Sequence, residues 1–562
     1  MNNKEHTFEV KDTKPVSVKS KYATDTRNVL RQPNPPLPPF TKGGRGRLML
    51  FALCSLLLLG CASVKEYTEP KEPSEGQIVL FLKGTEKPST NITFELTAVK
   101  IMADDGTYKD IVSDPIRVNS ITIAGRQLLL SEKYLPEGNY KKLQLAVKEA
   151  SIKRKDRTAT LALPAEGIVL DIDLTIKRDQ SAPLFLNWNA DASVEDVYLF
   201  RPVFSITGQV PELGSLLVYV TNENSNNVSV INRQTGDVVA TILVGKKPRG
   251  VAAGTLRERP RIYVSNSGSD SISVIDPTLN KIDVEIPIRF GKQPEGIAAA
   301  RVSANKELIF VTNYGSDNVS VIDAATYQEM EKINVGRGPI AVAVDPPAET
   351  QSRARFLSFE DINLLRDYGD RFFNVYVANR NSREVSVIKM DRRESRAVEV
   401  INLSVEWSPL TITVDSQRGK IYVGNYDYDG LSVIDVLQII RGNTAGAVSS
   451  ITNVGTSVVG ILADPDLDRI YLLREITGEI LIIRPFGEAL IPQRPTMVMS
   501  PVIDRIPVGN SPRSLVLDPE GRTIYVVNRG SNTVSVINKT TKRREKVIPV
   551  GKKPYGIAMF PF

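Results

Sequence analysis

Between residues 219 and 251 the chain reads Tyr219-Val-Thr-Asn222, then Val228-Ser-Val-Ile231, then Val244-Gly245, then Pro248-Arg-Gly250-Val251. The same order of short segments recurs along the second half of the chain, and the later copies begin at Tyr263, Phe310, Tyr376, Tyr422, Tyr471 and Tyr525. Repeats of about 40–50 residues built from short β-patterned runs are typical of β-propeller blades. The repeats therefore predict a rigid disc, whose chemistry depends on the loops that it presents.

Alternation of apolar residues places four strands in each repeat. Pro-x-Gly-Ile-Ala begins the innermost strand A, Tyr-Val-x-Asn forms strand B, Val-Ser-Val-Ile forms strand C, and the run into Val-Gly forms the outer strand D. The first strand B, at Tyr219, precedes the first strand A, at Val251, and the last strand A, near Ile557, has no strand B after it. We therefore predict an all-β, seven-bladed propeller with a closing blade, in which residues 555–561 pair beside residues 217–223, because closure removes two open sheet edges.

Residues 213–562 resemble the YVTN family of β-propeller repeat proteins, whose signature stands at Tyr219-Val-Thr-Asn222 and Phe310-Val-Thr-Asn313. Two repeats depart from the pattern. An insert at 347–373 has the spacing Phe356-x-x-Phe359-x-x-Ile362-x-x-Leu365, which predicts a short amphipathic helix. The repeat at Tyr471 lacks the Asn and the Ser and has an insert at 486–501. Such inserts mark a docking face or are variation in a tolerant loop, and both interpretations stay open.

Residues 76–210 contain alternating runs such as Ile78-Val-Leu-Phe-Leu82 and Val169-Leu-Asp-Ile-Asp-Leu-Thr-Ile176, separated by turn residues. This pattern predicts an antiparallel β-sandwich. The segments Gly138-Asn-Tyr-Lys-Lys-Leu-Gln-Leu145 and Leu186-Asn-Trp-Asn-Ala-Asp191 resemble a domain family of unknown function that is common in bacterial lipoproteins.

An apolar run at 48–60 follows Arg45 and Arg47 and leads into Leu58-Leu59-Gly60-Cys61. The run is too short to span a bilayer and has the plan of an export signal. It resembles a bacterial lipobox, which implies cleavage before Cys61 and attachment of lipid to that residue. Ala62 in place of Asp implies, by the same resemblance, sorting to the outer membrane, with residues 61–75 as a tether.

The basic character of the chain lies ahead of this signal. Residues 1–60 contain ten Lys and Arg and four Asp and Glu, so they carry +6 of the net charge of +7. Residues 1–47 are polar and unpatterned, and they are either a disordered leader or the product of a start site placed too early. An excess of positive charge that is confined to this segment does not indicate nucleic acid as a partner.

The composition also bounds the chemistry. The single histidine is His6, and the two cysteines, Cys54 and Cys61, lie in or at the end of the signal. The commonest general base and the commonest ligand of zinc, copper and haem are therefore missing from the expected folded part. No cofactor is expected, and no spacing indicates a calcium loop.

Seven D–A loops are expected to ring the mouth of the central channel. They contain eight basic and two acidic residues. The candidate ligand-binding residues are Lys246, Lys247, Arg249, Lys292, Arg337, Trp407, Arg513, Lys552, Lys553 and Tyr555. A basic ring can hold an anion, but the B–C turns on the same face are acidic and oppose it, so a solvated rim is the alternative.

The sequence thus predicts a lipid-anchored, extracytoplasmic binding or scaffold protein of the bacterial cell envelope. Its partners would be the membrane, through Cys61, and an envelope protein or an anionic polymer. An enzyme is the less favoured interpretation: by resemblance, a lactonase-like or calcium-dependent hydrolase would gather acidic residues in the channel. A structural envelope protein is the other alternative.

Overall fold

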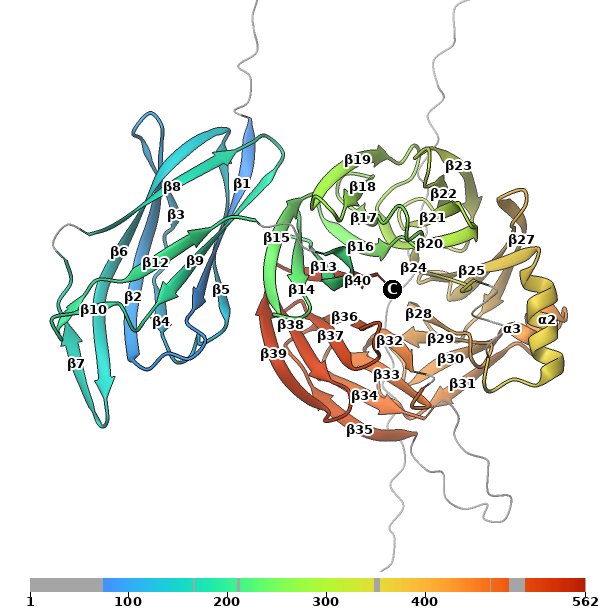
Figure 1. The fold of residues 1–562 in the computed structure, drawn as a ribbon. Helices are drawn as coiled ribbons and strands as arrows, with labels where there is room; N and C mark the ends of the chain where they lie inside the picture. Colours follow the sequence, from blue (N-terminus) through green and yellow to red (C-terminus); the bar gives the residue numbers. More distant parts are fainter. Residues whose placement is uncertain are drawn as a thin grey trace, which may run out of the picture. The chain divides into compact units, whose positions relative to one another are not determined.

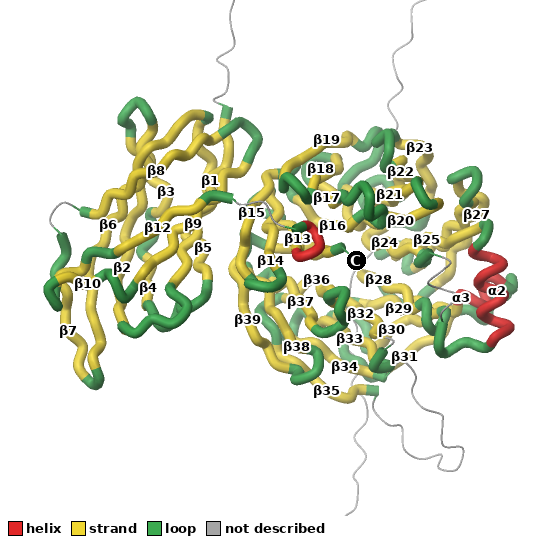
Figure 2. The backbone as a smooth tube through the Cα atoms, viewed as in Figure 1, coloured by secondary structure: helices red, strands yellow, loops and turns green. Residues whose placement is uncertain are grey.

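The computed structural model describes residues 74–164, 167–209, 213–347, 354–464, 466–484 and 501–560. Within these ranges the chain is nearly all β (Figure 1), and its helical elements are α2 (Phe359–Gly369), α3 (Val436–Ile440) and the 3-10 turn η1 (Gly214–Leu216) (Figure 2). The expected leader, the export signal, Cys61 and the tether up to residue 73 lie outside the described residues, as does most of the 486–501 insert.

Residues 75–207, here called the N-terminal sheets, form two sheets and a short hairpin. The first sheet has the strand order β12-β9-β1-β5: β1 (Glu75–Gly84), β5 (Gln127–Pro136), β9 (Ser181–Asn189) and β12 (Val203–Thr207). The second contains β2 (Asn91–Ala103), β3 (Tyr108–Val112), β4 (Ile116–Asn119), β6 (Gly138–Arg154), β7 (Arg157–Leu161) and β8 (Ile168–Ile176), and the hairpin is β10 (Val194–Glu195) with β11 (Leu199–Phe200). Both sheets contribute to one buried core, with Leu80 from the first and Phe94 from the second.

One strand pair in this region corrects the expectation of a purely antiparallel sandwich. Strands β1 and β9 run parallel, with Leu80 opposite Leu184. Parallel neighbours require a long crossover connection, and the whole second sheet lies in the chain between these two strands. The alternation of apolar residues is the same in parallel and antiparallel strands at a sheet face, so the sequence pattern did not distinguish them.

Residues 217–559 form a β-propeller, and in its described part there are seven four-stranded antiparallel sheets. Sheet 1 is β13 (Leu217–Asn222), β14 (Asn227–Asn232), β15 (Asp237–Leu243) and β40 (Pro554–Met559); sheet 2 is β16 (Pro248–Ala253), β17 (Ile262–Asn266), β18 (Ser271–Asp276) and β19 (Lys281–Pro287). Sheet 3 is β20 (Pro294–Ser303), β21 (Lys306–Asn313), β22 (Asn318–Asp323) and β23 (Glu329–Asn334); sheet 4 is β24 (Pro339–Val344), β25 (Phe372–Asn379), β26 (Glu384–Asp391) and β27 (Arg396–Ser404). Sheet 5 is β28 (Pro409–Asp415), β29 (Lys420–Asn425), β30 (Gly430–Asp435) and β31 (Val448–Thr452); sheet 6 is β32 (Val458–Asp464), β33 (Arg469–Arg474), β34 (Glu479–Ile483) and β35 (Val502–Pro507). Sheet 7 is β36 (Pro512–Leu517), β37 (Thr523–Asn528), β38 (Thr533–Asn538) and β39 (Arg543–Pro549).

The innermost strands of these sheets surround a central axis (Figure 1). Each of β16, β20, β24, β28, β32 and β36 contacts the next in the series, and β40 contacts both β36 and β16. Strand β40 also pairs with β13, with Tyr219 opposite Ala558. Sheet 1 is thus built from two segments that are far apart in the sequence.

A buried polar contact recurs in the repeats. In sheet 2, the side-chain amide of Asn266 at the end of strand B donates to the hydroxyl of Ser273 on strand C at 2.9 Å. The same Asn–Ser bond is present in sheets 1, 3, 4, 5 and 7. Both groups are buried, so the bond gives the Asn amide N–H a partner where water is excluded. In sheet 6, an ion pair between Arg474 and Glu479 at 2.9 Å stands near this position instead.

The described part of the 347–373 insert contains helix α2, which begins at a Ser358 cap whose hydroxyl accepts from the Asp361 N–H at 3.1 Å. Leu365 is buried against the outer part of the neighbouring sheets. Phe356 and Phe359 are 49% and 80% exposed, so they do not belong to the buried side of the helix. The three-residue spacing indicated a helix. The helix begins at Phe359, later than the spacing predicted, and these two aromatic side chains are exposed rather than part of its buried side.

The N-terminal sheets contact sheet 1 of the propeller. Phe81 and Phe185 share a buried cluster with Val220 and Ile231. The side chain of Gln127 accepts from the Val238 N–H at 2.7 Å and donates to the Val238 carbonyl at 3.0 Å, so it occupies backbone groups of the outer strand β15. Because the two regions share a core, experiments on this protein are best made on the full chain.

Candidate functional site

The D–A loops and the B–C turns meet on one face of the propeller, here called the mouth face. Most D–A loops bond to the B–C turn of the sheet that follows: the Ser267 N–H donates to the Lys247 carbonyl at 3.0 Å, and the Tyr314 N–H donates to the Gln293 carbonyl at 3.0 Å. Equivalent bonds lead into sheets 1, 4, 6 and 7, as from Arg529 to Ser511. The backbone of this face is therefore held by hydrogen bonds between consecutive sheets.

Acidic and amide side chains of the B–C turns hold these loops. Asp270, at a φ of 51°, accepts from the Gln293 N–H at 2.8 Å, and Asp317, at a φ of 55°, accepts from the Gly338 N–H at 2.8 Å. Asn and Asp tolerate this left-handed conformation better than most residues. Part of the negative charge on the mouth face thus has a structural role. From the sequence, this charge was expected only to oppose the basic ring.

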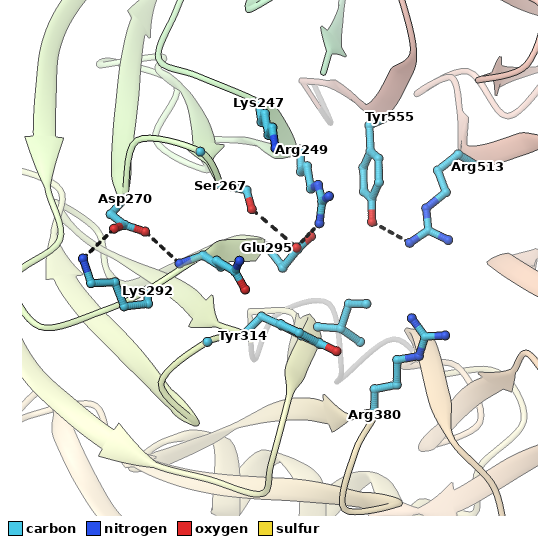
Figure 3. Close-up of a pocket in the computed structure, with 14 residues that line it drawn as sticks. Lys247, Arg249, Ser267, Asp270, Lys292, Glu295, Tyr314, Arg380, Arg513 and Tyr555 are labelled. Carbon is cyan, nitrogen blue, oxygen red and sulfur yellow. Dashed lines mark hydrogen bonds and ion pairs between the residues drawn. The ribbon is translucent and has the colours of Figure 1, made fainter. Parts of the chain in front are cut away.

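A cavity of about 870 Å³ opens on the mouth face (Figure 3). Its charged lining residues are Lys247, Arg249, Lys292, Arg380 and Arg513, with Asp270 and Glu295 as the acidic ones. The remaining lining residues are Ser267, Gly268, Gln293, Tyr314, Gly315, Ile340 and Tyr555. We call this the mouth cavity, and its lining carries three more positive than negative charges.

Arg249, on strand β16, lies between two carboxylates. It forms ion pairs with Glu223 at 2.8 Å and with Glu295, and Glu223 also contacts Arg529 at 2.6 Å. Burial opposes ionisation of Glu223, but hydrogen bonds from Arg529 and Arg249 outweigh it and lower its pKa. Burial raises the pKa of Glu295, although Arg249 acts against the shift. The charge of Arg249 is therefore compensated within the protein.

Arg513, on strand β36, has a different environment. Its guanidinium donates to the Tyr555 hydroxyl at 2.5 Å and lies over the Tyr555 ring, with 4.6 Å to the ring centre. Burial alone would lower the pKa of Arg513, but Tyr555 and the more distant carboxylates of Glu475 and Glu295 raise it, so the side chain is charged. No carboxylate of the described residues forms an ion pair with Arg513.

Lys247 and Arg380 are the other lining cations whose side chains have no carboxylate partner among the described residues. Lys292, in contrast, forms an ion pair with Asp270 at 2.8 Å. Figure 3 shows Arg380 and Arg513 on one side of the cavity, away from the Asp270–Lys292 pair. Lys247, Arg380 and Arg513 line the cavity at separate points, with Lys247 beside Arg249 (Figure 3), and we refer to these three cations together as the cationic cluster.

The mouth cavity continues into the channel. A second cavity of about 180 Å³ shares with it Arg249, Glu295, Ile340, Arg513 and Tyr555. These side chains therefore lie where the mouth narrows into the channel, between solvent and the inner strands.

Five of the ten residues expected from the sequence line the mouth cavity: Lys247, Arg249, Lys292, Arg513 and Tyr555. The other five do not line it: Lys246, Arg337, Trp407, Lys552 and Lys553. Trp407 stacks on Tyr428 with an interplanar angle of 6°. Lys552 lines a separate cavity of about 660 Å³ beside Glu132 and Lys133 of the N-terminal sheets.

Sequence reasoning missed Ser267, Tyr314 and Arg380 as lining residues. Each follows directly on the last residue of a strand B, at Asn266, Asn313 and Asn379. The residue that follows the strand-B Asn could therefore have been used to predict lining residues from the sequence.

The described residues contain no group of three or more His, Cys, Asp or Glu side chains placed to hold a metal ion.

Among those residues, we also find no helix with the length and apolar character that crossing a membrane requires.

No family model and no curated protein matches this chain. Several solved structures are similar to it at low identity. Hydrazine synthase of Kuenenia stuttgartiensis is 18% identical, with 58% of this chain and 93% of that chain covered and a TM-score of 0.45. A functionally unknown protein from Desulfotomaculum acetoxidans is 9% identical, with 62% and 99% covered and a TM-score of 0.48. Apo AztD from Citrobacter koseri is 16% identical, with 61% and 96% covered and a TM-score of 0.39. At these values the similarities assign neither an activity nor a ligand to this chain.

Proposed function

We propose that this chain is a lipid-anchored binding protein of the bacterial cell envelope, which holds an anionic ligand in the mouth cavity of a closed, seven-bladed propeller of the YVTN type. The repeated Tyr-Val-x-Asn strands and the pairing of β40 with β13 support the ring. The two N-terminal sheets around one core support the β-sandwich between the propeller and the lipid anchor.

The cationic cluster is the observation that carries the ligand class. Arg513 and Arg380 are partly buried, and neither has a carboxylate partner in the part of the chain that the structure describes. A charge that is withdrawn from water without a partner is costly. An arginine fork matches a carboxylate or a phosphate group with two hydrogen bonds. An anion bound between these side chains would supply the partner that the protein does not.

The place of action rests on the sequence. The lipobox-like Leu58-Leu59-Gly60-Cys61 supports lipid attachment at Cys61, and Ala62 supports the outer membrane as the destination. More than one acyl chain on Cys61 would make the anchoring stable, since one chain alone binds a membrane only marginally. The anion would then be a component of the envelope, either a polymer or an acidic group on a protein.

The experiment measures the melting temperature of the full chain in detergent with trigalacturonate, tripolyphosphate and maltotriose, which is neutral. A ligand that binds the folded state stabilises it by about 2.7 kcal/mol at one hundred times its Kd. We expect an anionic probe to raise the melting temperature and maltotriose to leave it unchanged.

The matched variants test the site. Arg380→Met with Arg513→Met should abolish the shift, whereas Lys246→Met with Arg337→Met, which removes two mouth-face cations outside the cavity, should keep it. An equal shift in both double variants, or no shift with either anion, would refute the proposal.

A further inference from the structure

The mouth cavity holds a buried carboxylate as well as the cationic cluster. Glu295, on strand β20, has a side chain that is 4% exposed. Its Oε1 atom accepts from Arg249 and, at 3.5 Å, from the Ser267 hydroxyl. Its Oε2 atom is buried and has no hydrogen-bond partner. Figure 3 shows this carboxylate near the centre of the cavity lining, between Arg249 and Ser267.

The great majority of buried polar atoms in proteins have a partner, and among the residues that line the mouth cavity Glu295 alone has a buried side-chain polar atom without one. A buried acceptor without one costs roughly 1–3 kcal/mol. The terminal torsion of a Glu side chain has broad minima. Rotation about this torsion is the movement that would bring an oxygen of Glu295, which lines the cavity, to a donor on a bound molecule.

Two simple ligand classes do not match this lining. A phosphate chain is rich in charge and has few donors, so it would meet the Glu295 and Asp270 carboxylates as repulsive neighbours, and an unpaired charge of this kind selects against a ligand. An ammonium group would satisfy Glu295, but it would enter a cavity whose lining is already net positive. A hydroxyl group donates without adding charge.

From this juxtaposition we infer that the ligand is an acidic saccharide, whose carboxylate binds the cationic cluster and whose hydroxyl groups donate to Glu295. This inference rests on the proposed anion site and names its ligand class. The volume of about 870 Å³ falls in the range of roughly 300–1,000 Å³ that suits molecules larger than a single small anion. Tyr314 adds an aromatic surface to the lining.

Calorimetric titration of the full chain in detergent tests the ligand class with three probes. Trigalacturonate carries carboxylates and hydroxyls, tricarballylate carries carboxylates alone, and tripolyphosphate carries phosphates. We expect trigalacturonate to bind at least about tenfold more tightly than either of the others, which is the effect of one hydrogen bond to a charged group. Equal or tighter binding of tripolyphosphate or tricarballylate would overturn the inference and leave the anion site standing. No binding of any probe would overturn both.

A variant pair assigns the effect to Glu295. In Glu295→Gln the preference for trigalacturonate over tripolyphosphate should fall about tenfold, whereas Glu406→Gln, on an exposed D–A loop residue, should keep it. An unchanged preference in Glu295→Gln would overturn the role of this residue. If that variant does not fold, the three probes on the unaltered chain still decide the ligand class.

Discussion

Two groups of charged side chains on the propeller have different partners. On sheet 6, Arg474 and Arg505 both contact Glu479, at 2.9 and 3.2 Å, and the neighbouring Glu475 accepts from the Ser511 hydroxyl at 2.8 Å. The cationic cluster, from the loop before sheet 2 and from sheets 4 and 7, has no carboxylate partner among the described residues. Under the proposed function, pairing, rather than the number of charges, distinguishes the cations that bind a ligand from those that are compensated within the protein.

The largest expected effect comes from removing strand β40, which closes the ring and carries the Tyr555 partner of Arg513. Deletion of residues 555–562 removes Tyr555 and most of β40, together with the buried side chains of Ile557, Met559 and Phe560. Loss of each large buried side chain costs about 2–5 kcal/mol, and the total approaches the whole stability of a typical domain, about 5–15 kcal/mol. We expect the shortened chain to lose its cooperative thermal transition in a circular dichroism melt.

The substitution Tyr555→Phe is the control, because it keeps the strand and removes only the hydroxyl that accepts from Arg513. It should melt cooperatively, close to the unaltered chain. A deletion variant with an unchanged melting temperature would show that β40 is dispensable.

The second test concerns the pKa of Glu295, which lines the mouth cavity. Burial raises the pKa of Glu295, so its contribution to stability is fully present below the ordinary pKa of a glutamate, about 4.3, and is lost as the pH rises through the folded-state pKa. Glu295→Gln lacks this loss. Its free energy of unfolding, measured with urea, should therefore rise relative to that of the unaltered chain between about pH 4 and neutrality.

The reference for this test is Glu223→Gln, because hydrogen bonds from Arg529 and Arg249 lower the pKa of Glu223. For that residue the sign reverses, since its contribution is present above the ordinary pKa and lost on acidification. Identical pH profiles for the two variants would contradict the assignment.

The smallest expected effect separates two adjacent lysines. Lys247 lines the mouth cavity and Lys246 does not. An exposed charge contributes little, about 0.2–1 kcal/mol, so Lys247→Met should weaken anion binding a few-fold and reduce its dependence on salt. Lys246→Met should change neither quantity. Calorimetric titration at two salt concentrations makes the measurement. Equal effects of the two variants would show that lining the cavity does not distinguish Lys247 from Lys246.

The propeller architecture was predictable because each strand carries its own signal. In sheet 2, Tyr263 and Val264 precede the polar Asn266 that bonds to Ser273, and this pattern repeats. The register of these neighbours is local, so the periodicity of apolar residues determines it. The parallel pairing of β1 with β9 was not predictable, because it depends on a partner about a hundred residues away.

The site was predictable only as a set of charges. The D–A loops showed that Lys247, Arg249 and Arg513 lie near the mouth, and the structure places all three in one cavity. Which of them are compensated depends on side chains from different sheets: Arg249 meets Glu223 and Glu295, whereas Arg513 meets the Tyr555 hydroxyl. Such convergence across a channel has no fixed spacing in the sequence.

The closure of sheet 1 has a consequence for how the protein is made. The Gly556 N–H donates to the Thr221 hydroxyl at 2.8 Å across 335 residues of chain. During synthesis, strand β13 leaves the ribosome long before its partner exists, so the ring cannot close on a partly translated chain. Contacts between such distant segments also form slowly. A product that stops short of β40 lacks both the closing strand and Tyr555. Closure of the ring therefore requires that the whole propeller segment has been synthesised.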